Sequence, residues 1–292
     1  MDFLNNYECY INVSLKKYNT YRIDATCKCL VFVHSVNELI ELLKNLKNNN
    51  IDYIILGNGS NIILASNYYD KVIIKLDKLN NITFNDNIVK VESGYSLPKL
   101  SFEILKHNLI GLEFAAGIPG LVGSSVAMNA GAYNKSMADV VKEITILDEN
   151  LNIKVLKNNE LKFRYRDSLL KENKKLIVLE VTLELEHGDV LEAKELIETR
   201  RQRRISTQPL NYPSSGSVFR NPEGMHAGEL IEKCNLKGYN INGAEISEKH
   251  ANFIINKDNC KGSDIISLVN LIKDKVKEKY NIDLILEQEI ID

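Results

Sequence analysis

The sequence lacks a large excess of charge of either sign. Its 292 residues carry a formal net charge of −2, and lysines are interspersed with aspartates and glutamates along the chain. This pattern is typical of solvated faces and gives no concentrated basic surface of the kind that binds nucleic acid. We therefore expect no nucleic-acid partner.

Long apolar runs are also missing. No segment approaches the ~20 consecutive apolar residues that cross a membrane. The opening residues, MDFLNNYECYINVS, do not place a basic segment before an apolar one, as a secretion signal would. We expect a soluble protein of the cytoplasm with no membrane partner. A hydrophobic content of 44% is enough for two or three packed lobes.

Cysteine and histidine are few and scattered. The cysteines are odd in number, which argues against a disulfide framework: Cys9, Cys27, Cys29, Cys234 and Cys260. Neither a second pair at zinc spacing nor an H-x-x-x-H pattern accompanies them. We expect reduced thiols and no metal site.

Proline and glycine are scarce enough that their clusters stand out. Of only five prolines, two bracket the stretch 213–222, PSSGSVFRNP. A surface loop would explain such a stretch, and so would a turn that holds a hydroxyl in place for chemistry. The stretch by itself leaves both interpretations open.

Apolar periodicity predicts helices and strands that alternate without a repeat. Helices are expected over 36–46, where Ser35 and Glu38 have the spacing of a capping box, over 193–204, and over 263–281 with Ser263 as N-cap. Strands are expected at 53–56, 61–64, 71–76, 82–84, 88–94, 143–147, 153–156, 175–186, 250–256 and 283–291, with hairpin turns at 85–87 and 148–150. The whole predicts an α+β protein, and composition becomes turn-rich near residue 199, where we expect a domain boundary.

Two glycine-rich stretches are candidates for cofactor contacts. In LGNGSN (56–61), Gly57 and Gly59 allow successive N–H groups to converge on phosphate oxygens, although a tight strand connection would use glycine in the same way. The stretch lacks the ending of a Walker loop and the helix of a Rossmann site. The second stretch, 115–132, is half glycine and alanine, which suits either a large flat ligand or tight helix packing. Together they favour a cofactor with a diphosphate.

The order of these motifs resembles the family of UDP-N-acetylenolpyruvoylglucosamine reductases, bacterial flavoenzymes that make UDP-N-acetylmuramate for peptidoglycan. From NTYRIDA (19–25) onward, eight blocks follow the family order: LGNGSNIIL, GLEFAAGIPGLVGSSVAMNAGAY, FRYRDS, QPLNYPSSGSVFRNP, AGELIE, LKG, HANFIIN and LEQEII. Asn58 and Asn235 stand where many relatives have glycine. The length resembles the compact class of the family, which lacks an inserted substrate-closing element.

The resemblance implies a fold and a cofactor. The fold is the two-lobed α+β FAD-binding fold of the vanillyl-alcohol-oxidase/PCMH type, with a C-terminal α+β substrate lobe. We expect FAD-binding lobes at 1–78 and 79–198 and a substrate-binding domain at 199–292. The residues implied in non-covalent FAD binding are Gly57, Asn58, Gly59, Ser60, Asn61, Pro119, Gly120, Gly123, Ser124, Asn129 and Gly131.

The resemblance also implies catalytic roles. NADPH is expected to reduce the flavin, which then reduces the enolpyruvyl group of a UDP-sugar. Ser217 aligns with the proton donor, Arg166 with the arginine that stabilises negative charge, and Glu289 with the glutamate before the final apolar pair. Arg164 and Glu287 are the competing assignments.

Further contacts to substrate and coenzyme are expected from basic and amide side chains. Arg220 and Asn221 are implied to hold the substrate, and the basic cluster, whose members are Arg200, Arg201, Arg203 and Arg204, could attract phosphates or be a solvated helix end. Two other functions would also fit a flavin-binding fold. A sugar or alcohol oxidase often tethers flavin through His or Cys, which both glycine-rich stretches lack, and a flavin-binding module without turnover would not need the catalytic set. We expect a monomer or a weak oligomer.

Overall fold

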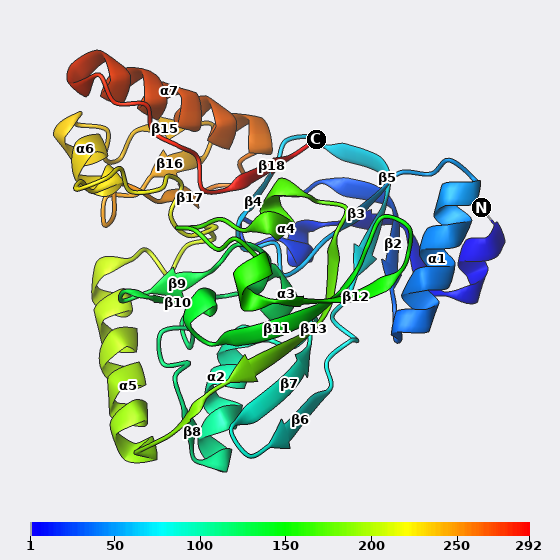
Figure 1. Ribbon diagram of the computed structural model, residues 1–292. Coiled ribbons are helices and arrows are strands. Elements are labelled where there is room, and N and C mark those ends of the chain that lie inside the picture. Colours follow the sequence, from blue (N-terminus) through cyan, green and yellow to red (C-terminus); the bar gives the residue numbers. More distant parts are fainter. Residues whose placement is uncertain (1) are drawn as a thin grey trace. The chain divides into compact units, whose positions relative to one another are not determined.

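The computed structural model describes residues 2–292 (Figure 1), and the chain divides into two compact units. Unit 1 comprises the chain up to Cys9 together with Leu30–Gly57 and Ile73–Arg201. Unit 2 comprises Tyr10–Cys29, Asn58–Val72 and Gln202–Asp292. The division passes through helix α5 (Val190–Thr207), so residue 199 lies inside a helix. The expected domains 1–78, 79–198 and 199–292 stay predictions.

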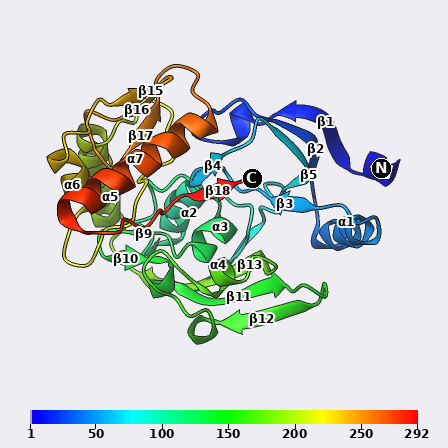
Figure 2. The same cartoon turned by 90° about the horizontal axis from the view of Figure 1, so that it is seen from above.

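Unit 1 contains an antiparallel five-stranded sheet. Its strands lie in the order β12 (Ile153–Lys157), β11 (Val141–Leu147), β13 (Ile177–Glu184), β7 (Ile88–Glu92) and β6 (Ile82–Asn85). Figure 2 shows β11, β12 and β13 side by side. The predicted hairpins are confirmed, since β6 pairs with β7 and β11 with β12. In both, a short polar turn returns the chain to its neighbour.

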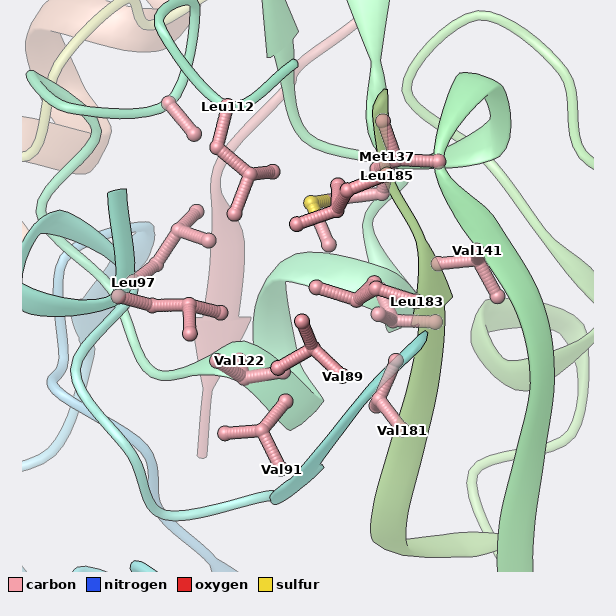
Figure 3. Packing of buried hydrophobic residues seen from close by; sticks show 14 of the residues in the cluster. Val89, Val91, Leu97, Leu112, Val122, Met137, Val141, Val181, Leu183 and Leu185 are labelled. Carbon is pink, nitrogen blue, oxygen red and sulfur yellow. The ribbon is translucent and has the colours of Figure 1, made fainter. Parts of the chain in front are cut away.

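One face of this sheet carries the core of unit 1. Alternate residues of β7 and β13 point inward, as a strand periodicity of two requires, and include Val89, Val91, Val181 and Leu183 (Figure 3). Helices α2 (Leu97–Glu103) and α3 (Val122–Ala127) bury their apolar faces in the same cluster. Each fully buried Val or Leu contributes roughly 1.5–3 kcal/mol. Short elements complete the unit: α4 (Leu169–Glu172), and the strand pairs β8 (Leu109–Ile110) with β14 (Glu186–His187) and β9 (Gly131–Ala132) with β10 (Lys135–Ser136).

A second sheet is four-stranded, and three of its strands contain residues assigned to both units. Its order is β1 (Glu8–Ser14), β2 (Thr26–Phe32), β5 (Tyr68–Lys75) and β3 (Tyr53–Ile55). Helix α1 (Val36–Asn48) begins as predicted, because the Ser35 side chain accepts a hydrogen bond from the N–H of Glu38 at 3.1 Å. The reciprocal half of the capping box differs: the Glu38 carboxylate accepts from the N–H of His34 at 2.7 Å.

Unit 2 has a three-stranded antiparallel sheet. The strands are β15 (Asn240–Ile241), β16 (Ala244–Ile246) and β17 (Ile254–Asn256), and helix α7 (Gly262–Tyr280) contacts the first two of them. Helix α6 (Ala227–Lys233) also packs on α7. Asn235, which follows α6, has φ of 56°. Asparagine tolerates this left-handed conformation better than most residues, which explains how it replaces a glycine.

The predicted N-cap of α7 is wrong. The helix begins at Gly262, and its N-cap is Lys261 instead of Ser263. The Asp264 carboxylate accepts a hydrogen bond from the N–H of Lys261 at 2.8 Å. A Cβ at position 262 would collide with the carbonyl oxygen of Leu64. Close approach of two backbones therefore requires glycine at the first position of this helix.

The predicted strand over 283–291 is shorter than expected. Strand β18 covers only Glu289–Ile291 and pairs in parallel with β4 (Ile62–Leu64). Before it, Leu286 forms an isolated antiparallel bridge with Phe219. The strand–loop–strand prediction for 53–64 is confirmed, but β3 and β4 pair with β5 and β18, respectively, and not with each other.

Two further observations concern residues 2–292 as a whole. No helix among them is both long and apolar enough to cross a membrane. Within the same residues, no group of three or more His, Cys, Asp or Glu side chains could hold a metal ion.

Candidate functional site

The residues Gly57–Asn61 form a turn between β3 and β4, which we call the cofactor turn. Gly59 has φ of 61°, and a Cβ there would collide with the carbonyl oxygen of Tyr18. The N–H of Thr20 donates to the Gly59 carbonyl at 3.0 Å. Only glycine meets both constraints, because an L side chain would be strained and would clash.

The backbone donors of the cofactor turn suit an anion. Within residues 2–292, the N–H groups of residues 57–60 donate no hydrogen bond to another protein group. Successive unengaged N–H groups around a left-handed residue form a concavity that binds phosphate oxygens. The donor set of this turn therefore fits the diphosphate of FAD.

Lys75, at the end of β5, is engaged with the same turn. Its side chain is 2% exposed, its Nζ donates to the Gly57 carbonyl, and Asp77 Oδ1 lies 3.1 Å away. Burial lowers the pKa of the Lys75 ammonium. In a trans peptide the C=O and N–H point in opposite directions, so a carbonyl held by Lys75 turns the N–H of Asn58 away from this ammonium. A charged donor on the carbonyl also polarises that N–H.

The small-residue segment, residues 115–132, includes α3. A Cβ at Gly123 would lie 2.6 Å from Ser93 Cβ, and the N–H of Gly123 donates to the Ser93 carbonyl at 2.9 Å. A Cβ at Gly131 would lie 2.8 Å from Ser136 Cβ and collide with the Lys135 carbonyl. At these two positions glycine allows tight packing, which was one of the two interpretations of the small-residue segment.

Of three other predicted cofactor residues of the segment, Pro119 and Gly120 precede α3, and Ser124 lies in its first turn. Pro119 and Ser124 are exposed, whereas Gly120 is buried. Ser124 Oγ donates to the carbonyl of Leu121 at 3.0 Å and lies 3.2 Å from the point where a Cβ of Gly57 would be. The small-residue segment and the first residue of the cofactor turn are therefore neighbours within unit 1.

Asn129 ties the segment to the predicted arginines. It is 5% exposed, its Nδ2 donates to the Arg164 carbonyl at 2.8 Å, and its Oδ1 accepts from the N–H of Ala138 at 3.0 Å. Arg166 Nη2 donates to the Gly131 carbonyl at 2.6 Å. Both side-chain contacts hold residues 164–166 against the end of the segment.

The two competing arginines differ in what engages them. Arg164 forms ion pairs with Asp167, at 3.3 Å, and with Glu172. Arg166 has φ of 54°, and its guanidinium lies 5.1 Å from the Tyr165 ring centroid. A left-handed conformation costs an arginine roughly 1–2 kcal/mol, and such strain is concentrated at functional sites. The choice of Arg166 over Arg164 stays a prediction.

Residues 213–222, which we call the serine turn, lie in unit 2. Ser215 is 2% exposed, and its Oγ lies 2.8 Å from Thr20 Oγ1. Gly216 has φ of 74°, and Ser217 follows it and is half-buried. Asn252 fixes the next residues, because its Oδ1 accepts from the N–H of Phe219 at 2.9 Å and its Nδ2 donates to the Phe219 carbonyl at 2.8 Å.

The serine turn is also bound by Gln288, which sequence reasoning did not assign to the site. Gln288 is 3% exposed, and its Nε2 lies 3.0 Å from the carbonyl oxygen of Ser215. The carbonyl oxygens of Gly216 and Ser217 each lie 3.4 Å from the same nitrogen. The available signal was strand alternation. If Glu287 and Glu289 share one face of the strand, Gln288 must lie on the opposite face.

Glu287 and Glu289 flank Gln288 and are both half-buried. The Asn61 side chain donates to the Glu287 carbonyl at 3.1 Å, and the N–H of Glu289 donates to the Asn61 carbonyl at 2.9 Å. Asn61, predicted to contact the cofactor, thus binds the segment of the predicted catalytic glutamate. The geometry leaves the choice between the two glutamates open.

The remaining predicted residues are spread over two elements. In the serine turn, the N–H of Arg220 donates to the Ile285 carbonyl at 2.9 Å, and exposed Asn221 accepts from the N–H of Ala227 at 3.1 Å. The basic cluster lies on α5 with varied contacts: Arg200 lies 4.5 Å from the Tyr133 ring centroid, Arg201 pairs with Glu198 at 3.1 Å, Arg203 accepts from Thr207 through its carbonyl at 2.7 Å, and Arg204 donates to Gln208 at 3.1 Å.

The fold and the donors of the cofactor turn define a class, and the comparisons agree with it. Residues 27–155 match the model of an FAD binding domain. The protein is an FAD-dependent oxidoreductase with a two-lobed α+β FAD-binding fold. Residues 208–291 match the model described as UDP-N-acetylenolpyruvoylglucosamine reductase, C-terminal domain. The chain belongs to the family of UDP-N-acetylenolpyruvoylglucosamine reductases.

Whole-chain similarity supports this membership. A UDP-N-acetylenolpyruvoylglucosamine reductase of Caldanaerobacter subterraneus is 42% identical over 290 residues, covering 99% of this chain and 96% of that protein. One of Clostridium perfringens is 40% identical over 99% of this chain and 95% of its own. The crystal structure of the enzyme from Thermus caldophilus is similar with a TM-score of 0.82 and 31% identity, covering 98% of this chain and 99% of that one. The resemblance stated from the sequence is confirmed.

Proposed function

We propose that the protein reduces UDP-N-acetylglucosamine enolpyruvate to UDP-N-acetylmuramate, with NADPH as the reductant, in the cytoplasmic synthesis of peptidoglycan precursors. The observation that carries the proposal is the serine turn, where a left-handed glycine and two buried amides fix the backbone around one half-buried serine. Such restraint of the backbone is expected where a hydroxyl must be positioned against a reacting atom. The name of the relatives, UDP-N-acetylenolpyruvoylglucosamine reductase, supports an enolpyruvyl UDP-sugar as the substrate class.

The cofactor is held, in this proposal, by backbone and small side chains. The N–H groups of Gly57, Asn58, Gly59 and Ser60 bind the diphosphate, and Lys75 keeps the first peptide of the turn oriented. The small-residue segment, through Pro119, Gly120, Gly123, Ser124, Asn129 and Gly131, lines the flavin further along. When bound, FAD supplies two-electron hydride chemistry, without a covalent bond to the protein.

The catalytic side chains act on the substrate. Addition of hydride to the terminal carbon of the enolpyruvyl group leaves negative charge on the neighbouring carbon and its carboxylate. The planar guanidinium of Arg166 stabilises that charge through two parallel N–H donors. Ser217 donates its proton to the neighbouring carbon, and Glu289 assists that transfer. One hydride and one proton are thereby added across the double bond.

Substrate and coenzyme need further contacts outside the reacting atoms. We assign Arg220 and Asn221 to the substrate, near its diphosphate or sugar. The basic cluster on α5 attracts the phosphates of NADPH or of the UDP-sugar before binding. We expect these effects to weaken as salt increases, because the exposed charges are then screened.

Two experiments test the function. The purified protein should be yellow, and acid denaturation should release FAD into the supernatant; a colourless protein that takes up no added FAD contradicts the proposal. Steady NADPH oxidation, beyond the amount that reduces the bound flavin, should then begin only when the enolpyruvyl UDP-sugar is added. Continuous NADPH oxidation without that substrate would favour an oxidase, and none with it would favour a binding module.

Replacing Ser217 with alanine should separate the two half-reactions. NADPH should still reduce the flavin, because that step precedes any need for the proton of Ser217. Reoxidation of the reduced flavin by substrate should slow by about 10²–10⁴-fold, the usual contribution of general acid catalysis. Rapid-mixing absorbance at the flavin band measures both steps. Equal slowing of the two would make Ser217 a structural residue.

A further inference from the structure

Two polar side chains that are buried in unit 2 meet next to the serine turn. Tyr21 is fully buried, and its hydroxyl donates to Gln288 Oε1 at 3.0 Å. The other end of the same amide, Nε2, faces the carbonyl oxygens of residues 215–217 at 3.0–3.4 Å. One side chain therefore contacts three consecutive peptide units, the last of which belongs to Ser217.

The tyrosine hydroxyl determines which way the amide faces. Burial raises the pKa of Tyr21 far above its ordinary value, so its oxygen carries a proton at neutral pH. A hydroxyl donor selects the amide oxygen as its partner, which leaves the two Nε2 hydrogens for the carbonyls. A rotated amide would set its oxygen against the carbonyl oxygens of the serine turn, which is unfavourable.

The residue before Tyr21 joins the serine turn to the cofactor turn. Thr20 Oγ1 lies 2.8 Å from Ser215 Oγ, and the N–H of Thr20 donates to the Gly59 carbonyl at 3.0 Å. The backbone of Tyr21 is fixed as well, because Asn256 Nδ2 donates to its carbonyl at 2.8 Å. Residues 20 and 21 thus give the two turns a common frame inside unit 2.

We propose that Gln288 is a positioning residue that sets the place of the Ser217 hydroxyl, and that Tyr21 sets the orientation of the Gln288 amide. The inference rests on the proposed proton donation by Ser217. Gly216 is conformationally permissive, so the turn needs an external restraint to hold Ser217 in one position. A displacement of about 1 Å between reacting groups costs up to ~100-fold in rate.

The test compares two buried tyrosine hydroxyls. Tyr21→Phe removes the bond to Gln288 and keeps the ring. Tyr69→Phe is the matched control, because Tyr69 is also buried, with 2% of its surface exposed, and its hydroxyl donates at 2.7 Å to the carbonyl of Ile291, on strand β18, and not to Gln288. Holoproteins of both variants are checked for FAD content and Tm, and the two half-reactions are followed by rapid mixing.

We expect Tyr21→Phe to slow flavin reoxidation by substrate about 10-fold, within the range that misplacement produces. Reduction by NADPH should change less than about twofold, since it needs no proton from Ser217. The solvent deuterium isotope effect on reoxidation should also increase, because proton delivery becomes more rate-limiting. Tyr69→Phe should lower Tm without any of these kinetic changes.

Equal kinetic effects of the two tyrosine variants, or none in Tyr21→Phe, would overturn the inference. Gln288→Leu, which removes the amide itself, should show the same half-reaction split with a larger slowing, and it provides the second measurement. Ser217→Ala separates this failure from that of the proposed function. If Ser217→Ala slows reoxidation while Tyr21→Phe and Gln288→Leu do not, only the role of Gln288 fails. If Ser217→Ala has no effect, the proposed proton donor fails first.

Discussion

The small-residue segment and the serine turn are fixed by opposite means. In the segment, Gly123 and Gly131 bring backbones so close that no side chain fits between them and residues 93 and 135–136. In the serine turn, a Cβ on Gly216 would have no neighbour within 4 Å. Instead, buried amides of Gln288 and Asn252 hold the backbone through hydrogen bonds. One region depends on missing volume and the other on side-chain donors and acceptors.

This difference matches what each region is proposed to do. Close-packed backbone is rigid and transmits strain, which suits a surface against which a large flat ligand rests. Hydrogen bonds hold a turn in one position while leaving open space around it, which suits a residue that must approach a reacting carbon. The two regions should therefore respond differently to added volume and to lost polar groups.

The largest effect is expected from added volume in the segment. Gly123→Ala would bring a methyl group to 2.6 Å from Ser93 Cβ and 3.3 Å from Ser93 O. The hydrogen bond between the same two residues prevents them from separating. We expect a loss of about 3 kcal/mol in the free energy of unfolding, the upper part of the usual range for overpacking. Urea denaturation of the FAD-free protein measures it, with Ser124→Ala, an exposed neighbour, as control. A loss below about 0.5 kcal/mol, typical of an exposed site, would contradict the packing argument.

The next effect separates the two glutamates. Glu289→Gln should slow flavin reoxidation by substrate at least ~100-fold, as loss of a group beside a developing charge does. Glu287→Gln should cost less than ~10-fold, or about 1.4 kcal/mol of barrier. Glutamine has nearly the same size and shape as glutamate, so the two pre-reduced variants can be compared directly by rapid mixing. The opposite ranking would move the catalytic role to Glu287.

A third experiment tests how the cofactor turn is held in place. It could be fixed by close backbone packing, as the small-residue segment is, or by side-chain hydrogen bonds, as the serine turn is. Lys75→Met removes the ammonium that holds the Gly57 carbonyl. Hydrogen bonds to charged groups contribute about 1.5–3 kcal/mol, so FAD affinity should fall at least ~10-fold. Lys78→Met removes an equal charge from an exposed side chain three residues away and serves as control. Equilibrium dialysis of released FAD gives both values, and equal affinities would show that glycine geometry alone forms the turn.

The smallest effect is expected at Gly216. Gly216→Ala meets no atom, so only its φ of 74° opposes the methyl group. Left-handed backbone costs an L residue roughly 1–2 kcal/mol. We expect an unfolding free energy lower by that amount and flavin reoxidation within about fivefold of wild type, because the amides still hold the turn. A loss as large as that of Gly123→Ala would remove the contrast between the two regions.

Local features of the fold were predictable from the sequence, whereas distant pairings were not. The hairpins at 85–87 and 148–150 follow from turn residues between short apolar runs. The partner of β4 could not be read in this way, since it lies on a strand made of residues 289–291. The N-cap prediction for α7 was wrong for a related reason: Gly262, its first residue, packs closely against Leu64, which is distant in sequence.

The candidate site shows the same division. Motif order assigned Ser217, Arg166 and the cofactor turn to the candidate site, and these assignments stay predictions. Lys75 and Gln288 were not predicted to belong to the site, although each is a polar residue at a buried position. Their partners are backbone carbonyls, and a carbonyl leaves no trace in the residue type at its position. Asn61 was predicted from the motif to contact the cofactor, but its side chain donates to a backbone carbonyl, that of Glu287.

The parallel pairing of β4 with β18 also bears on how the protein is made. Asn61 and Glu287, which lie beside that pairing, are 226 residues apart in the chain. A ribosome therefore completes the strand beside the cofactor turn only after the 226 residues that separate Asn61 from Glu287 have been synthesised. The sheet of residues 82–184, in contrast, has all its strands available much earlier, and domains fold as their residues emerge. During synthesis, the early segments of unit 2 keep one strand edge unpaired, and an unpaired edge is a template for pairing with another chain.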